Sequence, residues 1–171
     1  MGTAITIIAF IALFIFIIYG YTKSVEAKKR RDALDAKRGQ DWQHDASYFI
    51  TSTPSVDKIY QTMDKGVLAA SGIISGHGTG NDRIFQLPGG KLMFWEATLA
   101  QLTGAGDIFK YRFAVSNQQM INGIPQGQAK LDILLTQIEK AVLSLDKETQ
   151  IQRVAMEYTT ETHAERRIVK E

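Results

Sequence analysis

An uninterrupted apolar run at residues 3–22 limits what this chain can become more than any other feature of its sequence. The run contains no charged side chain, and as a helix it would reach about 30 Å, the thickness of the hydrocarbon core of a bilayer. A secretory signal peptide would need a basic segment before the run and a small-residue cleavage pattern after it, and neither is present. Tyr19 and Tyr21 close the run with aromatic rings, which are common at the headgroup level. We therefore predict a single uncleaved transmembrane helix over residues 1–22.

The next segment, residues 23–40, is predicted to be a basic helical stalk. Between residues 23 and 38 it carries seven basic side chains and three acidic ones. Because basic residues beside a membrane span stay on the cytoplasmic side, we expect the N-terminus outside and the remaining chain in the cytoplasm. The stalk could also contact anionic lipid headgroups, although a signal that only stops membrane transfer explains the same charges. Its candidate membrane-surface residues are Lys28, Lys29, Arg30 and Arg31.

Charge and cysteine content exclude several classes of function for the rest of the chain. The formal net charge is +2, of which the basic stalk contributes +4 (seven minus three), so the remaining residues carry about −2. A domain of this charge lacks the basic surface of a nucleic-acid-binding protein. The absence of cysteine excludes disulfides, cysteine nucleophiles and thiolate metal sites.

Residues 41–158 have the size of one ordinary domain, and their pattern predicts an α+β fold. A helix is predicted at residues 54–65, where a proline occupies the first position and apolar residues recur at helical spacing. Strands are predicted where aromatic and β-branched residues lie between glycine-rich breaks. These strands cover residues 47–53, 67–75, 83–87, 91–102 and 107–118.

The clearest helical pattern is an apolar stripe that runs from Leu131 to Leu145 at spacings of three and four residues. The pattern repeats after Asp146, so the helix is predicted to continue, bent or broken there, to Tyr158. Residues 159–171 are polar, carry both charges and are predicted to form a disordered tail.

The register of one hairpin follows from the cost of burying a carboxylate. A three-residue loop at 104–106 pairs Ala97 with Phe113 and places Glu96 on the opposite face, with Arg112 diagonal to it. A two-residue loop would reverse the parity and bury Glu96 among aromatic side chains without a partner. We therefore predict the three-residue loop.

The predicted element order is β-α-β-β-β-β-α, an antiparallel sheet packed against a long C-terminal helix. In element order this arrangement is similar to the helix-grip fold of START-like lipid-transfer proteins. In that fold a curved sheet wraps a long C-terminal helix around an apolar cavity. The similarity implies that a small apolar ligand could lie between the sheet and the helix.

No catalytic residue, metal site or cofactor is predicted. The glycine-rich stretch at 76–80 has G-x-G-x-G spacing and precedes a predicted strand, so it is not a phosphate-binding loop. His44, His77 and His163 are far apart and have no partner at metal-ligand spacing. No G-x-S-x-G nucleophile motif occurs.

We therefore predict a membrane-anchored, non-enzymatic interaction module that faces the cytoplasm and binds a protein partner or a second copy of itself. A membrane-tethered sensor or carrier of a small apolar ligand is the first alternative. An enzyme that uses Glu96, Arg112 or His77 is the second. The candidate binding residues are Leu92, Phe94, Trp95, Glu96, Arg112 and Phe113.

Overall fold

The computed structural model of the 171-residue chain describes residues 19, 22, 25, 45–90, 92–122, 124–161 and 166–169. The chain divides into two compact units, Met1–Gln40 and Asp41–Glu171. Apart from residues 19, 22 and 25, the predicted span at 1–22 and the predicted stalk at 23–40, with its lysines and arginines at 28–31, lie outside the described residues.

No helix in the described part of the chain is long and apolar enough to cross a membrane. The described residues therefore give no support to the predicted single-pass transmembrane helix, almost all of which lies outside them. The predicted cytoplasmic location of the second unit is not tested by any described residue and stays a prediction.

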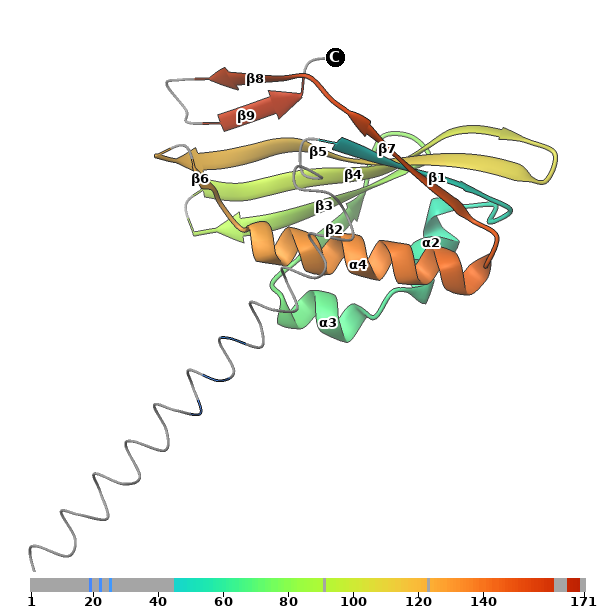
Figure 1. Ribbon diagram of the computed structural model, residues 1–171, viewed down its shortest axis with the longest axis horizontal. Helices are drawn as coiled ribbons and strands as arrows, with labels where there is room; N and C mark the ends of the chain where they lie inside the picture. The colour runs from blue at the N-terminus through green and yellow to red at the C-terminus, as the bar shows by residue number, and fades with distance from the viewer. Residues whose placement is uncertain are drawn as a thin grey trace, which may run out of the picture. The chain divides into compact units, whose positions relative to one another are not determined.

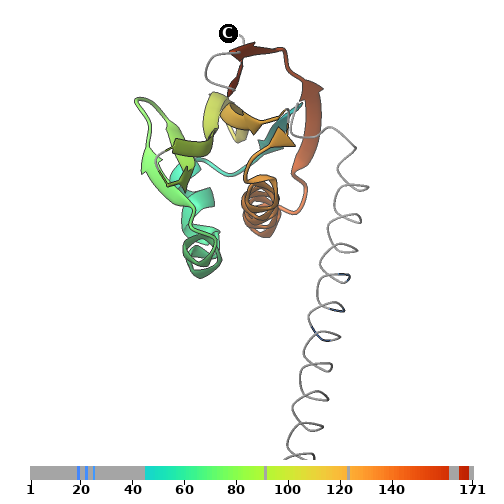
Figure 2. The ribbon, with the colours of Figure 1, turned by 90° about the vertical axis from the view of Figure 1, so that its left-hand side faces the viewer.

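The second unit is built on one antiparallel sheet with three helices on one side of it (Figures 1 and 2). The strands lie in the order β2-β3-β4-β5-β1-β7, and β9 pairs with both β5 and β8. The strands are β1 (Asp45–Thr51), β2 (Ile74–His77), β3 (Asp82–Gly89), β4 (Leu92–Ala105), β5 (Ile108–Ile121), β6 (Ile124–Pro125), β7 (Gln150–Ala155), β8 (Tyr158–Glu161) and β9 (Arg166–Val169). The helices are α2 (Val56–Thr62), α3 (Lys65–Ala70) and α4 (Gln128–Leu145).

The single helix predicted at 54–65 is wrong, because two short helices, α2 and α3, cover this region. The Asp64 side chain accepts a hydrogen bond from Val67 N at 3.1 Å and so caps a new helix at Lys65. The strand predicted at 67–75 is also wrong, since α3 occupies most of its first half. Gly72, with φ of +74°, ends that helix region in the left-handed conformation, and only Ile74–His77 forms a strand.

The predicted continuation of the C-terminal helix to Tyr158 is wrong as well. Helix α4 ends at Leu145, and Asp146 has an extended backbone. The Asp146 carboxylate accepts hydrogen bonds from Ser52 N at 2.7 Å and from Glu148 N at 3.0 Å, which turns the chain back towards β1. The following residues form β7, which pairs with β1 along its length.

These differences overturn the predicted fold class and the similarity to the helix-grip fold. The long helix α4 is followed by three more strands, so it is not the C-terminal element of the domain. Two of these strands, β8 and β9, fall largely in residues 159–171, for which a disordered tail was predicted. The domain is mainly antiparallel sheet with few helices.

The β4–β5 hairpin reaches the predicted side-chain orientation by a different register. Its loop has two residues, because Ala105 pairs with Ile108, and Ala97 pairs with Val115 instead of Phe113. The two-residue loop reverses the parity of the hairpin, and a bulge between Gln101 and Thr103 restores it for Ala97 and Leu99. A second register shift lies between Glu96 and Ala97. Because Trp95 and Ala97 on either side are both buried, Glu96 lies on the face away from the helices.

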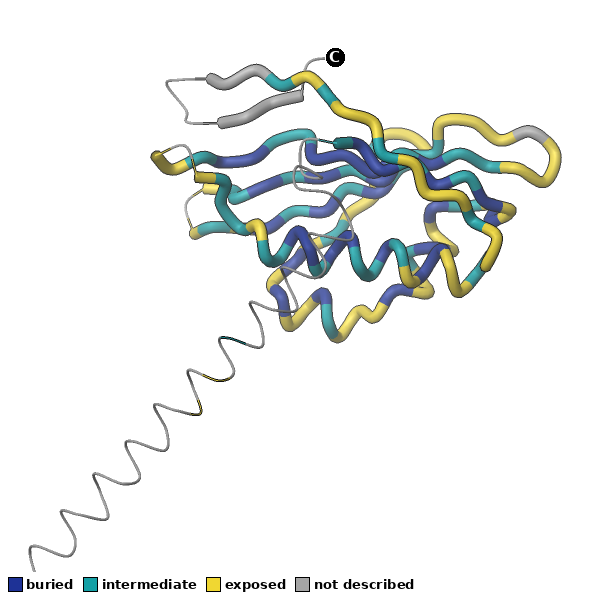
Figure 3. The backbone as a smooth tube through the Cα atoms, viewed as in Figure 1, coloured by how far each residue is buried: buried dark blue, intermediate teal, exposed yellow. Residues whose placement is uncertain are grey.

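The core lies between the inner face of the sheet and the helices, and Figure 3 shows buried segments alternating with less buried ones along the central strands. Trp95, Phe113, Leu134 and Ile138 are each at most 2% exposed. The Trp95 indole donates a hydrogen bond to Gly127 O at 3.0 Å, which ties the start of α4 to the sheet. The interface between sheet and α4 is therefore closely packed.

Candidate functional site

The six residues predicted to bind a ligand or partner do not form one surface. Trp95 and Phe113 are buried in the core. Phe94 is partly buried against that core. Glu96 and Arg112 each lie between buried residues of their strand and so are on the outer face of the sheet, which is the face opposite the helices. Leu92 is exposed at the start of β4.

Glu96 and Arg112 are not partners, contrary to the predicted diagonal contact. Glu96 accepts hydrogen bonds from Gln86 Nε2 at 2.7 Å and from Ser116 Oγ at 3.2 Å. In the observed register Glu96 lies opposite Asn117, and Arg112 is displaced along the hairpin. The carboxylate is thus held by neutral groups, and no ion pair joins it to Arg112 within the described residues.

Three exposed aliphatic side chains lie near the ends of β4, β5 and β6, and we call them the sheet-end patch: Leu92, Ile121 and Ile124. They are 58%, 43% and 63% exposed, respectively. Ile121 pairs directly with Ile124 in the β5–β6 ladder. Leu92 is the first residue of β4 and pairs with Gly89 of β3. The strand ends that carry these residues lie at the same end of the sheet (Figure 1).

Hydrogen bonds hold the backbone beneath the sheet-end patch. Gln126 N donates to Gln119 O at 2.9 Å, and the Gln126 side chain donates to Ile124 O at 2.9 Å. The fully buried Gln118 side chain donates to Gln126 O at 3.4 Å. These hydrogen bonds tie β6, which carries Ile124, to β5, which carries Ile121.

Sequence reasoning missed Ile121 and Ile124, which lie between the strand predicted at 107–118 and the apolar stripe that begins at Leu131, where no strand was predicted. A signal was present, since an Asn-Gly pair at 122–123 between two isoleucines is typical of a tight hairpin. Asn122 adopts φ of +50°, as such a turn requires.

A second group of side chains surrounds the guanidinium of Arg83, and we call it the β2-edge cluster: Asp57, Tyr60, Lys65, His77 and Arg83. The Arg83 guanidinium lies 3.5 Å from the centre of the Tyr60 ring. Its Nη2 donates to Asp57 Oδ1 at 3.3 Å and lies 3.2 Å from His77 Nε2. Lys65 Nζ lies 4.9 Å from the centre of the same ring.

The β2-edge cluster brings His77 to charged groups but not to a nucleophile. Ser75, the nearest hydroxyl on β2, donates its hydrogen bond to Tyr60 OH at 2.7 Å. His77 instead faces Arg83 and lies 3.8 Å from the Asp57 carboxylate. This arrangement stabilises charge and does not resemble an activated catalytic triad.

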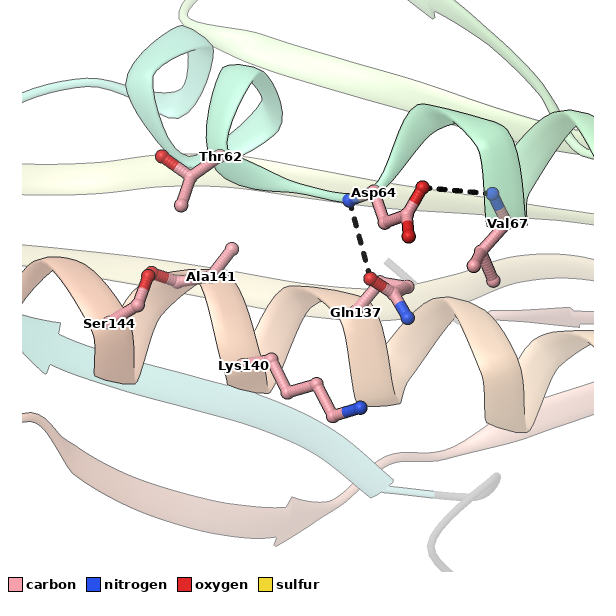
Figure 4. Close-up of a pocket in the computed structure, with 7 residues that line it drawn as sticks. All are labelled: Thr62, Asp64, Val67, Gln137, Lys140, Ala141 and Ser144. Carbon is pink, nitrogen blue, oxygen red and sulfur yellow. Dashed lines mark hydrogen bonds between the residues drawn. The ribbon is translucent and has the colours of Figure 1, made fainter.

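A shallow groove of about 370 Å³ lies between the α2–α3 connection and α4 (Figure 4). Asp64 N donates to Gln137 Oε1 at 3.3 Å across it. The lining residues are Thr62, Asp64, Val67, Gln137, Lys140, Ala141 and Ser144. The groove is lined by both polar and apolar side chains, and Ala141 at its floor also belongs to the core.

No group of three or more potential metal ligands occurs in the described part of the chain. No protein-family model, curated protein or solved structure was found to match this sequence. The function must therefore be argued from the geometry of the domain alone.

Proposed function

We propose that the domain is a non-enzymatic protein-interaction module that binds a partner protein through the sheet-end patch. The observation that carries this proposal is the exposure of Leu92, Ile121 and Ile124 on an ordered, hydrogen-bonded end of the sheet. Exposed aliphatic residues are common singly, but a cluster of them on a fixed scaffold is typical of an interaction site.

The energetics of the sheet-end patch suit association. Full burial of one aliphatic side chain contributes about 1.5–3 kcal/mol, so covering a half-exposed one contributes roughly 1 kcal/mol. The three side chains together would therefore contribute roughly 3 kcal/mol, more than a hundredfold in affinity. Because β6 is already hydrogen-bonded to β5, little conformational entropy is lost in this strand when the partner binds.

The two alternative functions receive less support from the geometry. A carrier of an apolar ligand would need a cavity between the sheet and α4, where Trp95 and Leu134 are instead packed against the core. An enzyme that uses Glu96 would need a free carboxylate, and Gln86 and Ser116 already occupy its oxygens.

The proposal is tested by introducing a photo-crosslinking amino acid in place of Ile124 in the full-length chain, in the cells that make it. We expect an adduct with one other protein, and we expect Ile121→Ser to abolish it. A matched control places the crosslinker at Ile108, which is equally exposed at the opposite end of the sheet. The Ile108→Ser substitution should leave the adduct at position 124 unchanged.

Two outcomes would overturn the proposal. Adducts that do not depend on Ile121 would show that the sheet-end patch is not the contact surface. An adduct with twice the mass of the chain would assign the patch to self-association instead of a separate partner.

A further inference from the structure

Strand β2 is one end of the strand order, and its hydrogen-bonding phase can be derived from one contact. Gly78 N donates to Asp82 O at 3.2 Å. The β2–β3 register pairs Gly76 with Ile84 and His77 with Arg83. Because hydrogen-bonded and non-hydrogen-bonded pairs alternate in an antiparallel ladder, Gly76 bonds to β3 and His77 does not.

The same alternation directs the main-chain groups of Ser75 and His77 away from β3. Their N–H and C=O groups have no main-chain partner among the described residues. A β-carbon at Gly76 would meet no atom within 4 Å, so the outer face of the strand is open at this point. Ile74, on the same outer face, is 56% exposed. The edge thus offers two donors and two acceptors to an added strand.

The charges beside this edge favour an acidic partner. Arg83 and Lys65 are basic residues, and the His77 side chain is 67% exposed. The Asp57 carboxylate contacts Arg83 and His77. The nearby Asp82 carboxylate is directed to its own loop, where it accepts a hydrogen bond from Gly80 N at 2.9 Å. The cluster therefore has more positive than negative groups.

Not all hydrogen-bond donors of Arg83 are used. Its side chain is 9% exposed, and its polar contacts with Asp57 and His77 both use Nη2. Its Nε is buried and has no hydrogen-bond partner. A buried guanidinium with incomplete hydrogen bonding gains from a second carboxylate.

We propose that an extended segment of a partner protein pairs with the open edge of β2 and places an acidic side chain against His77 and Arg83. On an added strand, the residues opposite Ser75 and His77 share the inner face with these two side chains, where the β2-edge cluster lies. The residues on either side of the acidic one lie on the outer face beside Ile74. The proposal rests on the proposed role as an interaction module but uses a different surface from the sheet-end patch.

The first test measures amide hydrogen exchange by NMR in the full-length free protein. We expect the amides of Ser75 and His77 to exchange quickly, while those of Ile74 and Gly76 are protected by β3. Equal protection of all four amides would show that the edge is already covered and would overturn the proposal.

The second test titrates the protein with a synthetic peptide, acetyl-Ser-Thr-Val-Glu-Val-Thr-Ser-amide, and with matched peptides that carry Gln or Lys in place of Glu. We expect the Glu peptide to bind at least tenfold more tightly than the Gln peptide and to protect the amides of Ser75 and His77. Equal binding of the three peptides, or protection confined to other strands, would overturn the proposal.

Variants separate this site from the sheet-end patch. Lys65→Glu changes an exposed side chain and should weaken binding of the Glu peptide about fivefold or more while the fold is retained. His77→Pro removes one outward-facing N–H and should abolish the protection. Ile124→Ser should leave peptide binding unchanged even if it abolishes the crosslink at the sheet-end patch. Loss of peptide binding in the Ile124→Ser variant would show that the peptide binds at the sheet-end patch and would overturn the proposal.

Discussion

Replacing Gly127 with alanine should destabilise the domain more than the same replacement at Gly90, a glycine of similar backbone conformation. Gly127 adopts φ of +70° at the start of α4, and a β-carbon there would lie 2.7 Å from Leu87 Cδ2 and 2.9 Å from Trp95 Nε1. The left-handed conformation costs a non-glycine residue about 1–2 kcal/mol. Overpacking against two buried side chains adds about 1–3 kcal/mol, for a total of roughly 2–5 kcal/mol.

Gly90 provides the matched control for this prediction. It adopts φ of +77°, close to that of Gly127, but a β-carbon there would meet no atom within 4 Å. Gly90→Ala should therefore lose only the conformational part, about 1–2 kcal/mol. Urea unfolding of both variants, followed by circular dichroism, measures the difference. Equal losses of unfolding free energy would refute the close packing of Trp95 and Leu87 against the start of α4.

Three further predictions concern the core and its polar contacts. Leu134→Ala should lower the unfolding free energy by about 2–5 kcal/mol in the same urea assay, because the side chain is fully buried; a loss under 1 kcal/mol would contradict the packed interface. Burial raises the pKa of Tyr111 to about 12, so its contribution to stability is complete below pH 10 and is lost as the pH rises towards 12. In thermal unfolding, Tyr111→Phe should therefore lose less stability at alkaline pH than the parent protein. The backbone amides of Ser52 and Glu148 lower the pKa of Asp146 below 3.8. Its stabilising effect is therefore present above pH 3.8 and is lost as the pH falls through the lowered pKa. An acid-unfolding profile that is unchanged in Asp146→Asn would contradict this.

The parts of the fold that could be predicted from sequence are those with a strong local pattern. The apolar stripe from Leu131 to Leu145 predicts α4, and its buried face packs on the sheet as expected. The orientation of Trp95 and Glu96 was also predicted, because burying an unpaired carboxylate is more costly than any local alternative. The cost of burying the Glu96 carboxylate determined which face of β4 is buried, but it did not determine the register of the β4–β5 hairpin.

Other elements depended on contacts that are distant in the sequence. Ile151 and Val154 have helical spacing. They nevertheless lie in strand β7, because β1 offers an edge for this strand to pair with. Asp146 ends α4 through hydrogen bonds to residues at the end of β1, almost a hundred positions earlier in the chain. No local propensity contains that information.

The candidate sites were predictable only in part. Leu92 was identified from the sequence because an apolar residue on the outer face needs a cover, and it is one of the three members of the sheet-end patch. Ile121 and Ile124 join it only through the β5–β6 pairing. The β2-edge cluster depends on the contact of Arg83 with Tyr60, which joins a strand to a helix and so has no local sequence pattern. Arg83 itself appeared to be an ordinary polar residue of a strand.

The most direct test of the central claim is the affinity of the crosslinked partner, once purified, for the full-length chain and its variants. We predict that the double substitution Ile121→Ser and Ile124→Ser weakens binding at least tenfold, since each lost contact is worth roughly 1 kcal/mol. Ile108→Ser, at the other end of the sheet, should leave the affinity within twofold of the parent protein. Equal affinities for the double variant and the parent would contradict the assignment of the sheet-end patch as the docking surface.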